Sequence, residues 1–347
     1  MFGKFQQEVD HGVRERIHAF MHVPGGFRRA SVHEENAQLE TFVRLIELVE
    51  LLKKQTGDAV PLRQNPQSKR VFIPKTKFTN LLRYWIDSEP DNIQQHFPFH
   101  RLHPWLHILT EFVPKLSRHR DWLENPSLLS RAALVERVDA INQVITTTKA
   151  HLFNSETLSA ASDFTRNANK NRLSLKRYTE SLLDHYGPLQ SLRLDLGYLD
   201  RVTYAARHLP DIAFLDMEQH RKRLIEYVRR QLAPSPVGYI WKLQHSATTS
   251  YRFHLILLFR QDDLSFAQLR GDQIGRHWVQ AIAQGRGGYF NWNVPDNEFE
   301  RNGTGYIRIP SELKSTIEYV TRLDRYMRLT TPVKSHTLVK GTMPKSK

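Results

Sequence analysis

The sequence predicts an α+β protein in which an all-helical N-terminal domain precedes a domain built on an antiparallel sheet. In the first half, apolar residues recur at helical spacing, as in Glu40 to Gln55, and no segment alternates convincingly as a strand does. After Pro188 the pattern changes, because Ser191 to Tyr198 alternates apolar and polar residues. Val237 to His245 and Tyr251 to Phe259 are apolar segments separated by turn-forming residues, which is typical of a β-hairpin.

The predicted helices of the first half each carry one apolar stripe. Besides Glu40 to Gln55, the pattern covers Lys77 to Ile86, Pro104 to Lys115 and Ser130 to Leu152, and these stripes can meet in one bundle-like core. Gly57 to Lys75 contains three prolines and is expected to be a loop. We therefore predict a helical N-terminal domain over residues 1–180, with no function assigned to it.

The second half is expected to fold around the hairpin. The order β-α-β-β-α-β-α favours an antiparallel sheet with helices packed on it. This domain is placed at residues 186–330, and residues 331–347 are predicted to be a basic tail. Its further elements are helices at Asp216 to Leu232 and Gly271 to Gln284, an edge strand at Tyr289 to Val294 and a last helix at Ser311 to Arg328.

The composition favours a soluble protein with a polyanionic partner. Of 347 residues, 50 are Lys or Arg and 36 are Asp or Glu, so the formal net charge is +14, which favours nucleic acid. The absence of cysteine excludes disulfides and thiolate metal sites. There is no apolar run of about 18 residues and no secretory pattern at the N-terminus, so we expect a cytoplasmic protein with no membrane partner.

Residues of the hairpin and of the last helix are candidates for a catalytic site. Side chains alternate along a strand, so Arg252 and His254 should project from the same face. Tyr319, Arg322 and Tyr326 are spaced by three and four residues and should share one face of the helix. A tyrosine with a cation one turn away suits nucleophilic attack on a phosphodiester. Because a phenol with a pKa of about 10 is a weak nucleophile, a divalent metal on the phosphate is also expected.

Taken in chain order, these segments resemble a known family. Leu192-Arg193-Leu194-Asp195-Leu196 in a strand is followed by a hairpin with aromatic-Trp-x-x-Gln and Phe-His-Leu-x-Leu-Leu-Phe, and then by a helix with Tyr-x-x-Arg. This order resembles the HUH rolling-circle replication initiators and, more closely, the inovirus-type replication protein family of filamentous phages and prophage elements. The resemblance covers Ser191 to about Arg328, and Ser335-His336-Thr337-Leu338 is similar to the family's C-terminal end.

The resemblance implies a HUH endonuclease-like domain that nicks single-stranded origin DNA, stays joined to the 5′ phosphate through tyrosine and later rejoins the ends. Tyr319 matches the nucleophile of the family's Tyr-x-x-Lys motif, and Arg322 matches its lysine. His254 matches the second histidine of the His-hydrophobe-His pair, and Gln244 matches the ligand on the preceding strand, so these two would hold Mg²⁺ or Mn²⁺. The implied partners are single-stranded DNA, origin DNA and a host helicase or polymerase.

One position departs from the family pattern. Arg252 stands where the family has its first histidine, and arginine cannot ligate a metal because it stays protonated. Three accounts follow: a weakened metal site, metal-free chemistry in which Arg252 clamps the phosphate, or an inactive domain that only binds DNA. The cations predicted to contact DNA are Arg193, Arg252, Arg325, Arg328, Lys176 and Arg177.

Two other functions compete with the nicking enzyme. A catalytically silent DNA-binding protein could use the same surface for repression, origin marking or recruitment. A single-stranded RNA-binding protein could instead stack bases on the aromatic residues of the hairpin. Those residues are Tyr239, Trp241, Tyr251 and Phe253.

Overall fold

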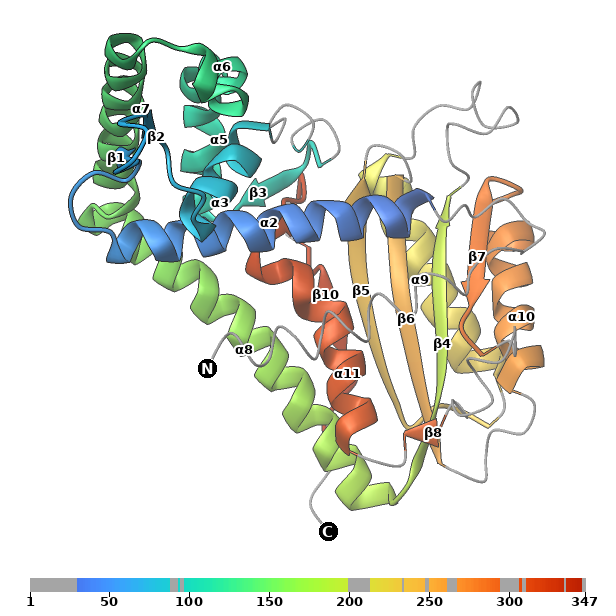
Figure 1. The fold of residues 1–347 in the computed structure, drawn as a ribbon. Coiled ribbons are helices and arrows are strands. Elements are labelled where there is room, and N and C mark those ends of the chain that lie inside the picture. Colours follow the sequence, from blue (N-terminus) through green and yellow to red (C-terminus); the bar gives the residue numbers. More distant parts are fainter. Residues whose placement is uncertain are drawn as a thin grey trace.

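The computed structural model describes residues 30–87, 93, 97–198, 213–232, 234–246, 250–260, 267–293, 306–307, 310–333 and 335–344. Within these residues the chain forms a helical unit and a unit built on an antiparallel sheet, joined by one long helix (Figure 1). The predicted α+β class is therefore confirmed.

The helical unit packs its helices around one apolar core. Leu45, Trp85 and Leu109 are among the side chains enclosed there. Ser130 begins one helix by accepting a hydrogen bond from the amide of Ala133 at 3.3 Å, as an N-cap residue does. The four helices predicted in this region are confirmed, and the predicted loop contains a short hairpin. The elements are α2 (Ala30–Lys54), β1 (Arg63–Gln64), β2 (Val71–Phe72), α3 (Lys77–Asp87), β3 (His100–Leu102), α5 (Pro104–Ser117), α6 (Arg120–Glu124), η1 (Pro126–Leu128) and α7 (Arg131–Leu152).

A single helix of 32 residues, α8 (Ser155–Tyr186), connects the two units. Asn154 caps its first turn by accepting a hydrogen bond from the amide of Thr157 at 2.7 Å. Gly187 ends the helix with a φ of 75°, a left-handed conformation that glycine adopts without strain.

The sheet places the predicted hairpin at its centre. Its strand order is β10-β5-β6-β4-β7, with all neighbours antiparallel, and β8 pairs with the start of β4. The hairpin consists of β5 and β6, so Arg252 and His254 lie on the central strand. The strands are β4 (Leu189–Tyr198), β5 (Gly238–Ser246), β6 (Ser250–Arg260), β7 (Gly287–Asn291), β8 (Tyr306–Ile307) and β10 (Leu338–Lys340).

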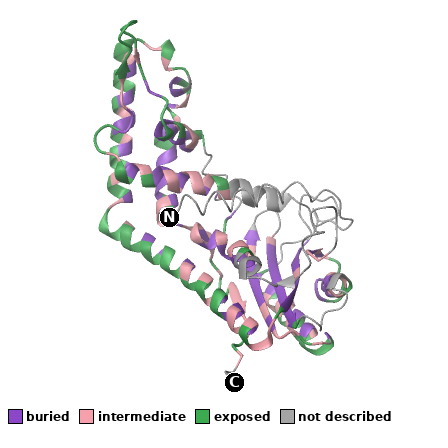
Figure 2. Cartoon of the chain, turned by 60° about the horizontal axis from the view of Figure 1, so that its bottom comes forward, coloured by how far each residue is buried: buried purple, intermediate pink, exposed green. Residues whose placement is uncertain are grey.

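Helices cover both faces of this sheet (Figure 1). Phe253 and Leu257 of β6 pack toward α9 (Phe214–Gln231), α10 (Ala267–His277) and the π-helical turn η2 (Trp278–Ile282). Ile256 and Leu258 pack on the other face, toward α8 and α11 (Pro310–Thr321). Figure 2 shows the resulting row of buried strands between exposed helix surfaces. One apolar core therefore lies on each face of the sheet.

The last helix is shorter than predicted. It ends at Thr321 rather than Arg328 and continues as a 3-10 turn, η3 (Arg322–Arg325). The chain then extends as β9 (Met327–Leu329), which pairs with β3 of the helical unit. Leu323 and Met327 enter the helical unit's core, and a continuing helix could not bring both there while also pairing with β3.

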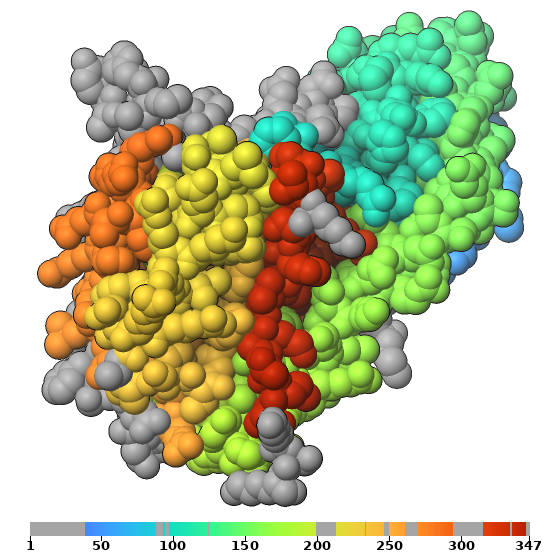
Figure 3. Space-filling model, turned by 180° about the vertical axis from the view of Figure 1, so that it is seen from behind, coloured from blue at the N-terminus to red at the C-terminus, as the bar shows by residue number. Residues whose placement is uncertain are grey.

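The C-terminal boundary also differs from the prediction. Residues 327–329 belong to the helical unit through β9, and residues 338–340 are not a free tail but the edge strand β10, paired with β5. On the face seen in Figure 3, the C-terminal segment forms a strip between α9 and α8. Among the described helices, none is both long enough and apolar enough to cross a membrane.

Candidate functional site

A cluster of polar side chains lies on the sheet face that α8 and α11 cover. Asp195 of β4 is paired with His254 of β6, and Gln244 of β5 is paired with Arg252. Asp195, His254 and Arg252 are 4%, 3% and 1% exposed, so the cluster is held inside the protein. Strand alternation places these side chains on the face opposite Phe253.

Hydrogen bonds connect the cluster into a chain. His254 Nδ1 bonds to the Asp195 carboxylate, and His254 Nε2 lies 2.6 Å from Gln244 Oε1. Arg252 Nη2 donates to the same oxygen at 2.7 Å, which fixes the orientation of the Gln244 amide. Both ring nitrogens of His254 are therefore engaged in hydrogen bonds with side-chain oxygens.

The neighbours of Asp195 lower the pKa of its carboxyl. Although burial raises the pKa of the Asp195 carboxyl, the charge and hydrogen bond of His254 outweigh it, and Arg252 and Arg193 act in the same direction. The net result is a pKa below the usual range, so Asp195 is a carboxylate at neutral pH. The cluster therefore contains one buried anion beside a histidine and two arginines.

The two residues predicted as metal ligands do not fit a divalent metal in this arrangement. Gln244 Oε1 is already hydrogen-bonded to Arg252 and His254, and both ring nitrogens of His254 are hydrogen-bonded, whereas metal binding needs a bare nitrogen. The guanidinium of Arg252 beside them would repel a cation. No group of three or more His, Cys, Asp or Glu residues suitable for a metal occurs in the described part of the chain.

Tyr319 of α11 lies over this cluster. Its ring stands edge to face with the His254 ring, with centroids 5.4 Å apart. The guanidinium carbons of Arg322 and Arg193 lie 5.1 Å and 5.6 Å from the Tyr319 ring centroid, and the Trp292 ring lies 5.8 Å away. Tyr319 thus has a guanidinium from the start of η3 and another from β4 within cation-π range.

Trp292 and Asp195 were not predicted as site residues. Trp292 follows β7, and its amide donates to the carbonyl of Arg193 at 3.0 Å, while Asn293 bonds to the backbone on both sides of Leu192. The Arg193 guanidinium lies 4.9 Å from the Trp292 ring centroid. Alternation along β4 could have placed Asp195 beside His254, but no sequence period relates Trp292 to Tyr319.

The other predicted DNA-contacting cations lie elsewhere. Arg325 is ion-paired with Glu318 at 3.0 Å, and Arg328 lies 4.0 Å from the ring centroid of Phe164 and donates to its carbonyl. Arg325 therefore fastens η3 to α11, and Arg328 fastens β9 to α8. Lys176 and Arg177 are exposed on α8, and Lys176 is 3.6 Å from Glu180.

The structure places Tyr326 and the hairpin aromatics away from the Tyr319 site. Tyr326 does not share a face with Tyr319, because the helix has ended; its ring stacks on Phe42, with centroids 6.0 Å apart. Trp241, Tyr251 and Phe253 are buried under α9 and α10, so they do not present their rings to a nucleic acid base.

No protein-family model, curated protein or solved structure was found to match this chain.

Proposed function

We propose that this chain is a replication initiator of the inovirus type, which nicks and rejoins single-stranded DNA through Tyr319. The observation that supports it is the position of the Tyr319 ring, packed on His254 between the guanidinium groups of Arg193 and Arg322. These residues come from the strand, hairpin and helix that carry the family resemblance. Cations close to a tyrosine can stabilise its phenolate and the charge that develops on an attacked phosphodiester.

In this mechanism the Tyr319 hydroxyl oxygen attacks the phosphorus and the bond to the 3′ oxygen breaks. The phenol proton ends on the released 3′ hydroxyl, and the 5′ phosphate remains on Tyr319. Arg193 and Arg322 stabilise the phenolate and the charge that develops on the phosphoryl oxygens, while Asp195 orients the His254 ring through its hydrogen bond. Reversal of the step with the 3′ end of another strand rejoins the DNA. We assign no step to a metal, because Gln244 and His254 bond to each other.

A covalent-adduct assay tests the proposal. Purified protein and labelled single-stranded DNA, with and without chelator, are expected to give an adduct that survives denaturing electrophoresis. Tyr319→Phe should abolish the adduct and keep DNA binding, because only the attacking oxygen is removed. Tyr227→Phe is the matched control, since Tyr227 stacks on His277 on the opposite side of the sheet, with centroids 3.7 Å apart. An adduct that persists in Tyr319→Phe contradicts the assignment.

The same assay distinguishes the nicking enzyme from a second candidate, a DNA-binding protein without nuclease activity. The observation in favour of this second candidate is that Gln244 Oε1 is hydrogen-bonded to both Arg252 and His254. For this function we expect no adduct under any metal condition, with binding that weakens as salt rises.

A further inference from the structure

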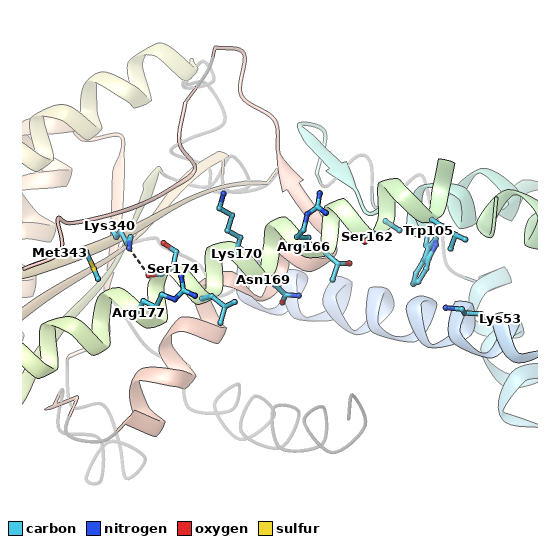
Figure 4. A pocket seen from close by; sticks show the side chains of 14 residues that line it. Lys53, Trp105, Ser162, Arg166, Asn169, Lys170, Ser174, Arg177, Lys340 and Met343 are labelled. Carbon is cyan, nitrogen blue, oxygen red and sulfur yellow. Dashed lines mark hydrogen bonds between the residues drawn. The ribbon is translucent and has the colours of Figure 1, made fainter. Parts of the chain in front are cut away.

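A groove of about 970 Å³ runs along the exposed side of α8, away from the Tyr319 site (Figure 4). Its walls come from α2, α5, α8, β10 and the residues after β10, so it spans the helical unit and the sheet unit. None of its lining residues belongs to the polar cluster around Tyr319. The groove is therefore a second concave surface that the proposed nicking chemistry does not use.

Every charged side chain that lines the groove is a cation, and no carboxylate lines it. Arg166, Lys170 and Arg177 are separated by four and seven residues along α8, which places them on one side of the helix over about 16 Å. Arg166 forms an ion pair with Asp163 at 2.5 Å, whereas Lys170 and Arg177 make no ion pair with any described residue. Lys53 and Lys340 stand toward the two ends of the groove (Figure 4).

The surface between these cations is largely apolar. Leu158 and Leu173 are 38% and 41% exposed and add apolar area to the groove. Trp105 adds an indole ring at one end, and Ser162 and Asn169 add neutral donors. Proteins that bind single strands combine a cationic groove for the phosphates with aromatic and apolar surface for the bases. A duplex would expose only phosphates here, and an acidic peptide would leave the apolar surface unused.

We propose that this groove binds a segment of single-stranded DNA, with Lys170 and Arg177 on the phosphates and Trp105 against a base. The choice of DNA over RNA rests on the proposed function, while the groove's preference for a single strand rests on its own lining. The groove would hold the strand independently of the reaction at Tyr319.

Fluorescence anisotropy with a labelled single-stranded DNA oligonucleotide tests this in the full chain carrying Tyr319→Phe, so that nicking does not affect the result. Each phosphate contact contributes about 0.7 to the slope of log affinity against log salt on a single strand. Lys170→Gln with Arg177→Gln should therefore lower the slope by about 1.4 and weaken binding about 25-fold at 0.1 M salt. Lys222→Gln with Arg223→Gln removes the same charge from exposed positions of α9. This control should change neither the salt slope nor the affinity.

A second measurement locates the strand directly. Light-induced cross-linking of a bromodeoxyuridine-substituted oligonucleotide should label the peptide that contains Trp105. Equal losses of affinity in the two double variants, or cross-links confined to other peptides, would overturn the proposal. Tighter binding of an RNA strand, a duplex or an acidic peptide in competition would overturn the choice of single-stranded DNA. A failed adduct assay with intact groove binding would reject the nicking function alone.

Discussion

At the scale of single residues, Arg252 determines the chemistry of the polar cluster. It is 1% exposed and donates to Gln244, so the amide oxygen must face both Arg252 and His254. The other ring nitrogen of His254 bonds to the Asp195 carboxylate, so the four side chains form one hydrogen-bonded chain. Arg252 thus makes the cluster one that disfavours a metal cation.

Replacing Arg252 by histidine should restore metal binding. Arg252→His removes the guanidinium from Gln244 and adds a second imidazole, so we expect Mn²⁺ to bind about tenfold or more tightly than to the wild type, measured by calorimetry. Arg252→Lys is the control, because it keeps a cation beside Gln244 and should show no gain. Unchanged Mn²⁺ affinity in Arg252→His would show that another feature excludes the metal.

At the scale of elements, a buried ion pair holds η3 against the sheet. Lys242 of β5 bonds to Asp324 of η3, and their side chains are 7% and 8% exposed. The turn begins with Arg322, so the same contact positions the cation next to Tyr319. The ion pair therefore couples the end of α11 to the strand that carries Gln244.

Removing one partner should destabilise the protein strongly. Asp324→Asn leaves the Lys242 charge buried without its anion, and we expect a loss of about 3–5 kcal/mol in the free energy of unfolding, measured with urea. Lys176→Gln breaks an exposed pair and should cost less than about 1 kcal/mol. The double variant Lys242→Met with Asp324→Leu should recover most of the loss. A loss in Asp324→Asn as small as that of Lys176→Gln would contradict the structural role.

At the scale of the whole molecule, a half-buried histidine, His100, and a buried one, His103, lie where the two units meet. His100 is on β3, which pairs with β9, and the His103 amide donates to the Tyr326 carbonyl at 2.7 Å. Burial lowers the pKa of His100 to about 3, helped by His245 and Lys242 of the sheet unit. Burial and the charge of Arg328 lower the pKa of His103 to about 4. Both rings are therefore neutral at neutral pH.

Acid should loosen this junction before it affects the rest of the fold. A histidine with a folded-state pKa of about 4 and an unfolded value of about 6.5 binds more protons when unfolded, so stability falls as pH drops below 6.5. For His103, which is 4% exposed, the loss at pH 5 is about 2 kcal/mol.

Denaturant unfolding at pH 7 and pH 5 measures this effect. His103→Asn retains a residue suited to the N-cap of α5 and should reduce the difference between the two pH values by about 2 kcal/mol. His107→Asn is the control, because His107 is exposed and paired with Glu111 at 3.3 Å. A pH dependence that is identical in His103→Asn and the wild type would rule out His103 as a cause.

Much of the secondary structure could be predicted from the sequence because local periods report it. Helices such as α3 and α7 and the hairpin β5-β6 begin and end within a few residues of their predicted limits. The common face of Arg252 and His254 followed from alternation alone. Hydropathy could not predict the end of α11, because the apolar pattern continues through Met327 while the partner strand β3 lies more than 200 residues earlier.

The sequence by itself determined the α+β class, the central hairpin and the face on which Arg252 and His254 lie. Only the tertiary structure decided that Tyr319 packs against His254, that Trp292 joins it and that Arg325 and Arg328 contact Glu318 and Phe164. The physical reason is the range of the interactions. Helical and strand periods arise between residues a few positions apart, whereas the site is built from contacts between β4, β5, β6 and α11, which no local pattern encodes.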